Sequence, residues 1–483
     1  MRTTSRHWET GVRLSPPKGA NTKHPKWQST AKLQFRELDH VHCIHLFDSE
    51  SSLLFADQLS FWLGKEGCSI PIRPLPANAK LSQVCHRLKG KQPFYLLLDN
   101  TEEYLLQASL LLKSIPALLR AGVKTILLLK QGEAPPREKQ PLEQTLGTRL
   151  HHIIRTMDSR LHVPKDSKLL EKRRDAQYRR VAREVAGTRM GLVLSSGGAK
   201  GFAYIGVLQV LEELGLEFDV IAGSSIGAVI GALWARGHDA AQMGECARKF
   251  NKWLHLRRLF DHVMDIRRGL LRGDRLEKYL RSLLADANFT DLSVPLYVSG
   301  TDVDNLRSVM FSDGDVASAL HASVAIPGIC IPCERNGNTY IDGGVSNPLP
   351  VHSLRDRGIE NILAVSTVFR ARHGYEMRQH REHSEKHERK RKPFRHRINA
   401  ELNLFANGNA FDVLMRSIET AHGRMVEPEI DMADLVLEPH APDSRWQEFL
   451  QPEKYLHAGE ITAKAHIQEL QELELSRKKG IHQ

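Results

Sequence analysis

The chain has 483 residues, which is enough for two or three domains because single hydrophobic cores stop growing well below that length. A hydrophobic content of 41% and a charged content of 26% are typical of globular proteins, so a packed core is expected. The net charge of +11 predicts attraction to an anionic surface, either nucleic acid or phospholipid head groups. An aromatic content of only 6% argues against a protein that stacks single-stranded bases.

Cysteine content and apolar run length exclude two further classes. Six cysteines in so long a chain do not make a disulfide framework, and they favour a reducing compartment. Cys330 and Cys333 have C-x-x-C spacing, but no second Cys or His pair nearby completes a zinc site, so neither a metal nor another cofactor is expected. The longest uncharged apolar run has 16 residues, between Asp219 and Arg236. As a helix it spans about 24 Å, short of the roughly 30 Å hydrocarbon core of a bilayer.

In chain order, residues 1–38 lack the apolar core of a signal peptide and predict a basic, disordered tail. Buried parallel strands are then predicted by short apolar runs at 41–47, 70–72, 94–98 and 125–129. Helical patterns lie between these runs, and such alternation predicts a small, doubly wound, Rossmann-like α/β domain over residues 39–164. The turn after its first strand, FDSESS, has no G-x-G-x-x-G motif, which favours a structural or regulatory domain over a nucleotide-binding one.

A second and larger α/β unit follows a charged linker helix, which is expected over residues 165–189. From Met190 the pattern runs strand, glycine loop, helix, strand, serine turn and helix. This order predicts a main α/β domain built from residues 190–369 and 398–440. A helical segment is expected at the C-terminal end, over residues 441–483.

Residues 370–397 interrupt the main domain with a basic segment. They hold 11 Lys and Arg, 4 Glu and 5 His, and they show no apolar period. One interpretation is a solvated, disordered insertion. The other is an electrostatic anchor for anionic lipid, worth up to about 1 kcal/mol for each basic residue near the surface.

The first motif with chemical meaning is SGGAKG, residues 196–201, between a predicted strand and a predicted helix. In that position consecutive backbone N–H groups at the positive end of a helix dipole point toward an anion. Glycines permit the positive φ and the close approach that this turn requires. By itself the motif also fits an ordinary phosphate-binding or tight turn.

The second motif is GSSIG, residues 223–227, which has the G-x-S-x-G pattern of a nucleophile elbow around Ser225. Gly223 and Gly227 stand where side chains would clash, and the setting of strand, turn and helix is the one that an elbow needs. With Gly231, the same glycines repeat at every fourth position, as in a membrane helix that dimerises through small residues. The short apolar run makes that alternative the weaker one.

The third motif is Asp342-Gly343-Gly344, directly after a predicted strand at 339–341. An aspartate at a strand end with glycines behind it can turn its carboxylate into a neighbouring cleft. The same three residues also fit a simple turn.

The order of these three motifs resembles the patatin-like phospholipases, and residues 205–235 and 321–350 look like the neuropathy target esterase branch of that family. The resemblance implies a three-layer α/β/α hydrolase domain in which Ser225 is the nucleophile and Asp342 the base. The oxyanion donors that it implies are the backbone amides of Gly197, Gly198 and Ala199. Members of the branch often carry cyclic-nucleotide-binding domains, but there is no room for one ahead of the first α/β domain, so cyclic-nucleotide regulation is not expected.

The resemblance further implies the activity of a serine lipid acyl hydrolase, a phospholipase or lysophospholipase acting on carboxylic esters. The expected partners are a phospholipid or lysophospholipid substrate and an anionic membrane surface, with no nucleic acid, for a cytoplasmic protein that binds membranes peripherally. Two alternatives remain, a catalytically weak lipid-binding adaptor and an acyltransferase that uses the same acyl-enzyme.

The family's turn begins with three glycines, and here Ser196 replaces the first, which could alter the turn or add a hydroxyl donor. His321 and His352 lie near the proposed cleft in sequence, and each is expected to be a helix-surface or packing residue. Lys200 is expected either to meet a substrate phosphate or to be solvated. The residues expected to support the motifs are Ser196, Lys200, Gly201, Gly223, Gly227, Gly343 and Gly344.

Overall fold

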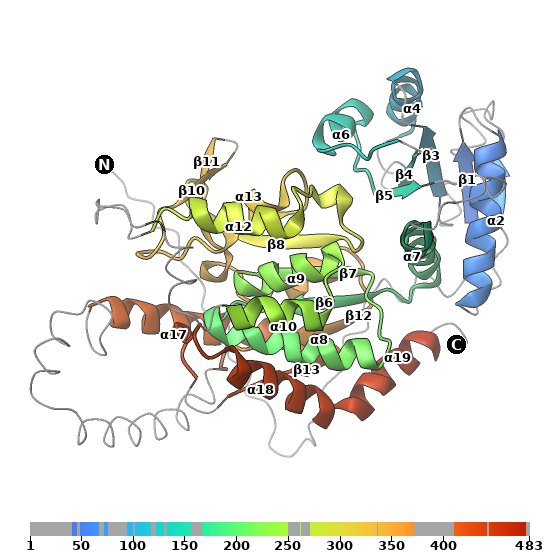
Figure 1. Ribbon diagram of the computed structural model, residues 1–483. Coiled ribbons are helices and arrows are strands. Elements are labelled where there is room, and N and C mark those ends of the chain that lie inside the picture. Colours follow the sequence, from blue (N-terminus) through green and yellow to red (C-terminus); the bar gives the residue numbers. More distant parts are fainter. Residues whose placement is uncertain are drawn as a thin grey trace, which may run out of the picture.

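The computed structural model contains two separate β-sheets, joined through one long helix (Figure 1). It describes residues 41–45, 49–66, 72–75, 94–99, 102–116, 122–129, 133–155, 167–249, 261, 271–335, 337–370, 410–441 and 444–479. The predicted tail at 1–38 and, apart from Arg370, the predicted basic insertion at 370–397 lie outside these residues. The boundaries assigned to the domains stay a prediction.

The smaller sheet has five parallel strands in the order β2-β1-β3-β4-β5. Its strands are β1 (Val41–His45), β2 (Ile72–Leu75), β3 (Phe94–Asp99), β4 (Val123–Leu129) and β5 (His152–Arg155). Its helices are α2 (Ser49–Lys65), α4 (Glu102–Ser114), α6 (Gln140–Leu146) and α7 (Ser167–Ala186).

Alternate side chains of β3 face opposite helix layers, as the pleat of a strand requires. Phe94 and Leu96 pack with α4 and α6, whereas Tyr95 and Leu97 pack with α2 and α7. Helices therefore cover both faces of a parallel sheet, and the predicted doubly wound α/β class is confirmed.

The larger sheet has the order β10-β11-β8-β7-β6-β12-β13, with β9 paired to β8. The neighbouring strands β8, β7, β6, β12 and β13 pair in parallel. The pairs of β8 with β9, β8 with β11 and β11 with β10 are antiparallel. The strands are β6 (Met190–Leu194), β7 (Val220–Ser224), β8 (Leu296–Asp302), β9 (Arg307–Phe311), β10 (Cys333–Arg335), β11 (Asn338–Asp342), β12 (Asn361–Val365) and β13 (Leu435–Leu437).

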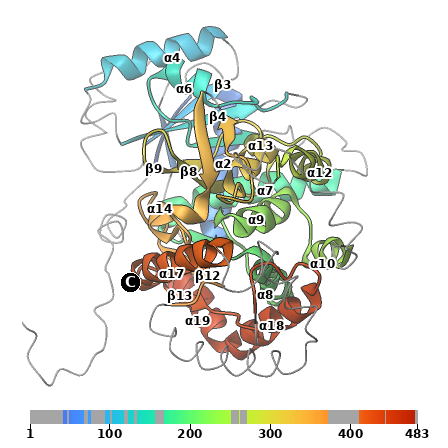
Figure 2. The ribbon, with the colours of Figure 1, turned by 90° about the vertical axis from the view of Figure 1, so that its left-hand side faces the viewer.

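Two helix layers cover this sheet, which confirms the predicted three-layer arrangement (Figure 2). Leu192 and Leu194 of β6 face one layer, and Val193 faces the other. The first layer holds α8 (Ala203–Glu213), α9 (Ile226–Arg236), α10 (Ala240–Lys249), α12 (Asp274–Leu284), α13 (Val316–Ser323), α18 (Pro452–Ala465) and α19 (Ile467–Lys479). The second holds α14 (Val351–Arg355) and α17 (Ala410–Asp431).

Helix α7 connects the two sheets through buried ion pairs. Arg183 contacts Glu66, directly after α2, at 3.0 Å and Asp219, next to β7, at 3.1 Å. Glu184, the next residue, pairs with Lys124 of β4 and, at 2.9 Å, with Arg189 at the entrance to β6. Both charges are buried, so the removal of one partner would leave the other uncompensated.

No helix in the described ranges is long and apolar enough to cross a membrane. The glycine-spaced apolar run instead forms β7, the serine turn and the 11-residue helix α9.

Helix α18 packs on α8 at a crossing of two glycines. A Cβ on Gly459 would lie 1.9 Å from the Ala203 carbonyl oxygen, and a Cβ on Gly206 would lie 2.0 Å from the Leu456 carbonyl oxygen. These contacts are with backbone, which cannot move aside as a side chain can. The C-terminal helices are therefore closely fitted to the helix that follows the SGGAKG turn.

We predict that Gly459→Ala destabilises the protein by about 1–3 kcal/mol or more, because the added methyl group has no space. The matched control is Gly244→Ala, a helical glycine of α10 whose added Cβ would meet only side-chain atoms at 3.5 Å. The control is expected to be neutral or slightly stabilising. Urea unfolding of both variants measures the difference, and equal stabilities would contradict the predicted crossing.

Candidate active site

Ser225 lies at a sharp turn between β7 and α9 and has positive φ, with φ 53° and ψ −123°. This backbone conformation is strained for a residue other than glycine and is held by its surroundings. A Cβ on Gly227 would lie 2.4 Å from the Leu194 carbonyl oxygen, and one on Gly223 would lie 2.6 Å from the Ala228 nitrogen. The two glycines that flank Ser225 are therefore required by the packing of the elbow.

The last turn of α13 holds the backbone of this elbow. The Ser225 amide donates a hydrogen bond of 3.0 Å to Ser323 Oγ, and both groups are buried. Two residues later, the Ala325 carbonyl accepts a hydrogen bond of 2.9 Å from the Asp342 amide. One short segment thus fixes the backbones of both motif residues.

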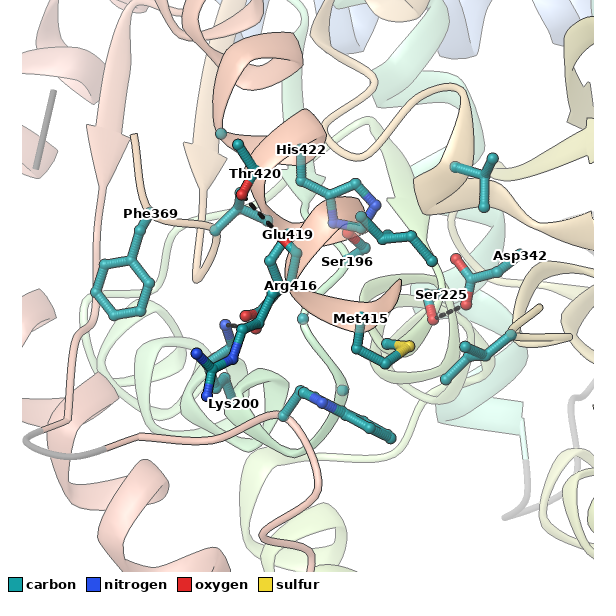
Figure 3. A pocket seen from close by; sticks show the side chains of 18 of the residues that line it. Ser196, Lys200, Ser225, Asp342, Phe369, Met415, Arg416, Glu419, Thr420 and His422 are labelled. Carbon is teal, nitrogen blue, oxygen red and sulfur yellow. Dashed lines mark hydrogen bonds and ion pairs between the residues drawn. The ribbon is translucent and has the colours of Figure 1, made fainter. Parts of the chain in front are cut away.

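Asp342 ends β11 and directs its carboxylate toward Ser225 (Figure 3). Oδ2 accepts a hydrogen bond of 2.6 Å from Ser225 Oγ, and Oδ1 accepts one of 2.7 Å from the Gly344 amide. A Cβ on Gly343 would lie 2.3 Å from the Ser299 carbonyl oxygen, so only glycine lets the chain cross β8 so closely. Burial raises the pKa of Asp342 to about 6, although the hydrogen bonds from Ser225 and Gly344 oppose the increase.

The SGGAKG turn lies beside this pair and begins a 3-10 turn, Gly198–Phe202, that continues into α8. Gly197 and Gly198 line a cavity together with Ser225 and Asp342. Their amides donate to no other residue that the structure describes. Both amides are therefore available to an oxyanion.

Ala199 does not fit its predicted role as a third oxyanion donor. Its amide donates a hydrogen bond of 2.7 Å to the Trp446 carbonyl oxygen, and its side chain is buried away from the cavity. Trp446 also approaches Gly198, which has φ 58°, so a Cβ there would lie 2.5 Å from the same oxygen. A carbonyl oxygen of the segment after β13 thus accepts a hydrogen bond from the amide that the motif had suggested as an oxyanion donor.

Gly201 packs against Ile226 of the elbow.

The cavity has a volume of about 630 Å³ and combines an apolar wall with a basic one. Its apolar lining includes Ile326, Val345, Phe369, Met415, Ile418 and Trp446. Its basic lining consists of Lys200, Arg370, Arg416 and Arg424. Figure 3 shows Lys200 and Phe369 on one side of the cavity and the pair of Ser225 and Asp342 on the other.

Lys200 is buried rather than solvated. Its Nζ lies 3.2 Å from Glu419 Oε1 of α17 and 5.2 Å from the centre of the Phe369 ring. Arg370 forms a bidentate ion pair with Glu438, in which Nε donates to Oε1 at 2.8 Å and Nη2 donates to Oε2 at 2.6 Å. Both basic groups are thus held in fixed positions by carboxylates at the cavity.

The two histidines that the motifs suggested lie elsewhere. His321 binds Glu277 at 2.9 Å, and His352 binds Glu429; neither lines the cavity. Burial opposes the charge on His321, but hydrogen bonds with Cys333 and Glu277 outweigh it and raise its pKa to about 10. His321 is therefore a buried packing residue, whereas the His352 side chain is partly exposed on α14.

The histidine that does line the cavity is His422 of α17, which no motif had indicated. It stands in a helix far beyond the three motifs, and only the three-dimensional packing of α17 on the sheet brings it there. In the described part of the chain, no group of three or more His, Cys, Asp or Glu could hold a metal ion. Cys330 and Cys333 are free thiols.

Comparison with known proteins shows which protein family resembles the part of the chain that forms this site. A sequence profile described as patatin-like phospholipase matches residues 192–355. An uncharacterized NTE family protein of Mycobacterium tuberculosis is 35% identical over 178 residues, which cover 37% of this chain and 49% of that protein.

Two relatives with more specific names are more distant. Lysophospholipase NTE1 of Cryptococcus neoformans is 30% identical over 189 residues, 39% of this chain and 12% of that protein. Patatin-like phospholipase domain-containing protein 6 of Mus musculus is 30% identical over 197 residues, 40% of this chain and 14% of that protein. The matches thus span half or less of each relative's length. The chain is therefore similar to the patatin-like phospholipases over residues 192–355, and to NTE family proteins over a comparable length.

Proposed function

We propose that the chain is a serine lipid acyl hydrolase that cleaves a carboxylic ester of a phospholipid or lysophospholipid with the pair Ser225 and Asp342. One observation carries the proposal: the hydrogen bond of 2.6 Å from Ser225 Oγ to Asp342 Oδ2, at a cavity that Gly197 and Gly198 also line. A strained serine, a buried base and free N–H donors are together the parts that acyl transfer requires.

In the first half of the reaction Ser225 Oγ attacks the acyl carbonyl carbon while its proton passes to Asp342. The Gly197 and Gly198 amides hold the oxyanion, and losing one such donor costs an enzyme about 10²- to 10³-fold in rate. The tetrahedral intermediate then releases the alcohol, which takes the proton from Asp342. In the second half water replaces the alcohol and the steps run in reverse.

The lining of the cavity supports a lipid with an anionic head group. Its apolar wall fits an acyl chain, and Lys200 and the three arginines fit a phosphate. Two of the relatives carry lysophospholipase or phospholipase in their names.

An anionic membrane surface is the proposed source of this substrate. Val413 and Leu414, in the first turn of α17 with described side chains, are exposed and directly precede the cavity-lining Met415. The net charge of +11 favours an anionic surface, and apolar side chains beside basic ones are suited to its interface. The alternative of a lipid-binding adaptor has no observation of its own in its favour.

We predict that Ser225→Ala and Asp342→Asn each lower kcat for fatty-acid release from a fluorescent lysophospholipid by about 10³-fold or more. The matched control is Ser224→Ala, because Ser224 is the buried neighbour whose hydroxyl has no hydrogen-bond partner among the described residues. The control should keep most of the activity. Equal rates for wild type and Ser225→Ala would refute the proposed nucleophile.

The activity should also depend on pH through Asp342. The carboxylate must be unprotonated to accept the serine proton, and its pKa is raised to about 6. We therefore predict that kcat/KM falls about tenfold for each pH unit below about 6 and is level above pH 7. An uncharged ester substrate isolates this titration, and an acid limb with its midpoint near pH 4 would contradict the buried base.

A further inference from the structure

Two buried polar atoms at the cavity have no hydrogen-bond partner in the described part of the chain. They are Ser196 Oγ, in the turn, and His422 Nε2, in α17. Both residues line the cavity, and Figure 3 shows the His422 ring next to Ser196. Because buried polar atoms are almost always paired in folded proteins, two unpaired ones at a reactive serine indicate a missing polar partner.

Gly344 is the common neighbour of both atoms. A Cβ on Gly344 would lie 2.9 Å from Ser196 Oγ and 3.0 Å from Asp342 Oδ1, so the Ser196 hydroxyl and the proposed base both lie close to Gly344. The ring of His422 lies near the backbone of the same residue, and this neighbour partly opposes the fall in the pKa of the ring.

The protonation state of the His422 ring follows from its surroundings. Burial, reinforced by the nearby Lys200, lowers the pKa of His422 to about 4, so the ring is neutral at pH 7. A neutral imidazole has one acceptor nitrogen. Nε2, which is buried at the cavity without a partner in the described part of the chain, is available for that role.

We propose that Ser196 and His422 position the water molecule that hydrolyses the acyl-enzyme, an inference that rests on the proposed function. A water molecule between a hydroxyl and an acceptor nitrogen donates to Nε2 and accepts from Ser196 Oγ. Its second proton then faces the Asp342 carboxylate, and its remaining lone pair faces the acyl carbon on Ser225 Oγ.

The step is balanced. The water oxygen bonds to the acyl carbon, one water proton passes to Asp342, and the bond from the acyl carbon to Ser225 Oγ breaks as that proton moves to Oγ. The products are a fatty acid and free Ser225. Ser196 and His422 exchange no proton, so they are positioning residues. An alcohol acceptor is larger than water, so the pair favours hydrolysis over acyl transfer.

The test separates deacylation from acylation in the full chain. With p-nitrophenyl butyrate, kcat/KM reports acylation of Ser225, and acid-quenched intact mass measures how much acyl-enzyme accumulates. We expect His422→Phe to keep kcat/KM within about threefold, to lower kcat at least tenfold and to accumulate acyl-enzyme. With glycerol present, it should also form more glyceryl ester per fatty acid. Ser196→Ala should change the same quantities in the same direction.

Two controls distinguish positioning from a purely structural role. His422→Gln keeps an acceptor near the position of Nε2 and should restore most of kcat. His457→Phe changes an exposed histidine of α18 that is not part of the cavity lining and should leave both parameters unchanged. The inference is overturned if His422→Phe lowers kcat/KM and kcat equally, or changes neither. It also fails if His422→Gln, still folded by circular dichroism, is as slow as His422→Phe.

The same experiment tests the underlying function separately. Acyl-enzyme that appears in wild type or any His422 variant, and disappears with Ser225→Ala, supports the proposed nucleophile whatever the effect of His422. If no Ser225-dependent acyl-enzyme forms in any variant, the proposed function fails, and the water site fails with it.

Discussion

The site depends on one close approach: where β11 ends at Asp342, the chain crosses β8 at Ser299 and holds Asp342 against Ser225. Strand β8 lies between β7 and β11, so the two residues meet only if the chain passes directly over β8. Gly343 makes this possible because any Cβ there would lie 2.3 Å from a carbonyl oxygen of that strand. Burial at the same place raises the pKa of the carboxyl group, which makes a weak base stronger.

Much of this arrangement could be predicted from the sequence, because its causes are local. A strand that ends at G-x-S-x-G has few conformations open to it, and apolar runs alternating with amphipathic stretches indicate an α/β fold with covered sheets. The α/β class and the three layers were predicted correctly. The approach of Asp342 to Ser225 came from the resemblance, since nothing in the spacing of 117 residues between them indicates a contact.

What the sequence did not predict comes from the C-terminal part of the chain. The patatin-like match ends at residue 355, yet Phe369, His422 and Trp446 line the cavity. The Trp446 carbonyl oxygen accepts a hydrogen bond from the Ala199 amide, which removes one of three predicted oxyanion donors. His422 had no motif around it. Contacts between segments more than 200 residues apart depend on tertiary packing, and neither propensity nor period indicates them.

The central claim is that Ser225 is the nucleophile, and the most direct measurement is covalent labelling of the full chain with a fluorophosphonate probe, followed by peptide mapping. Such a probe reacts with a serine only where a base activates it and an oxyanion site receives the phosphoryl oxygen. The account predicts a single labelled peptide modified at Ser225 and no labelling of Asp342→Asn. A label on any other residue, or equal labelling of the Ser225→Ala variant, would contradict it.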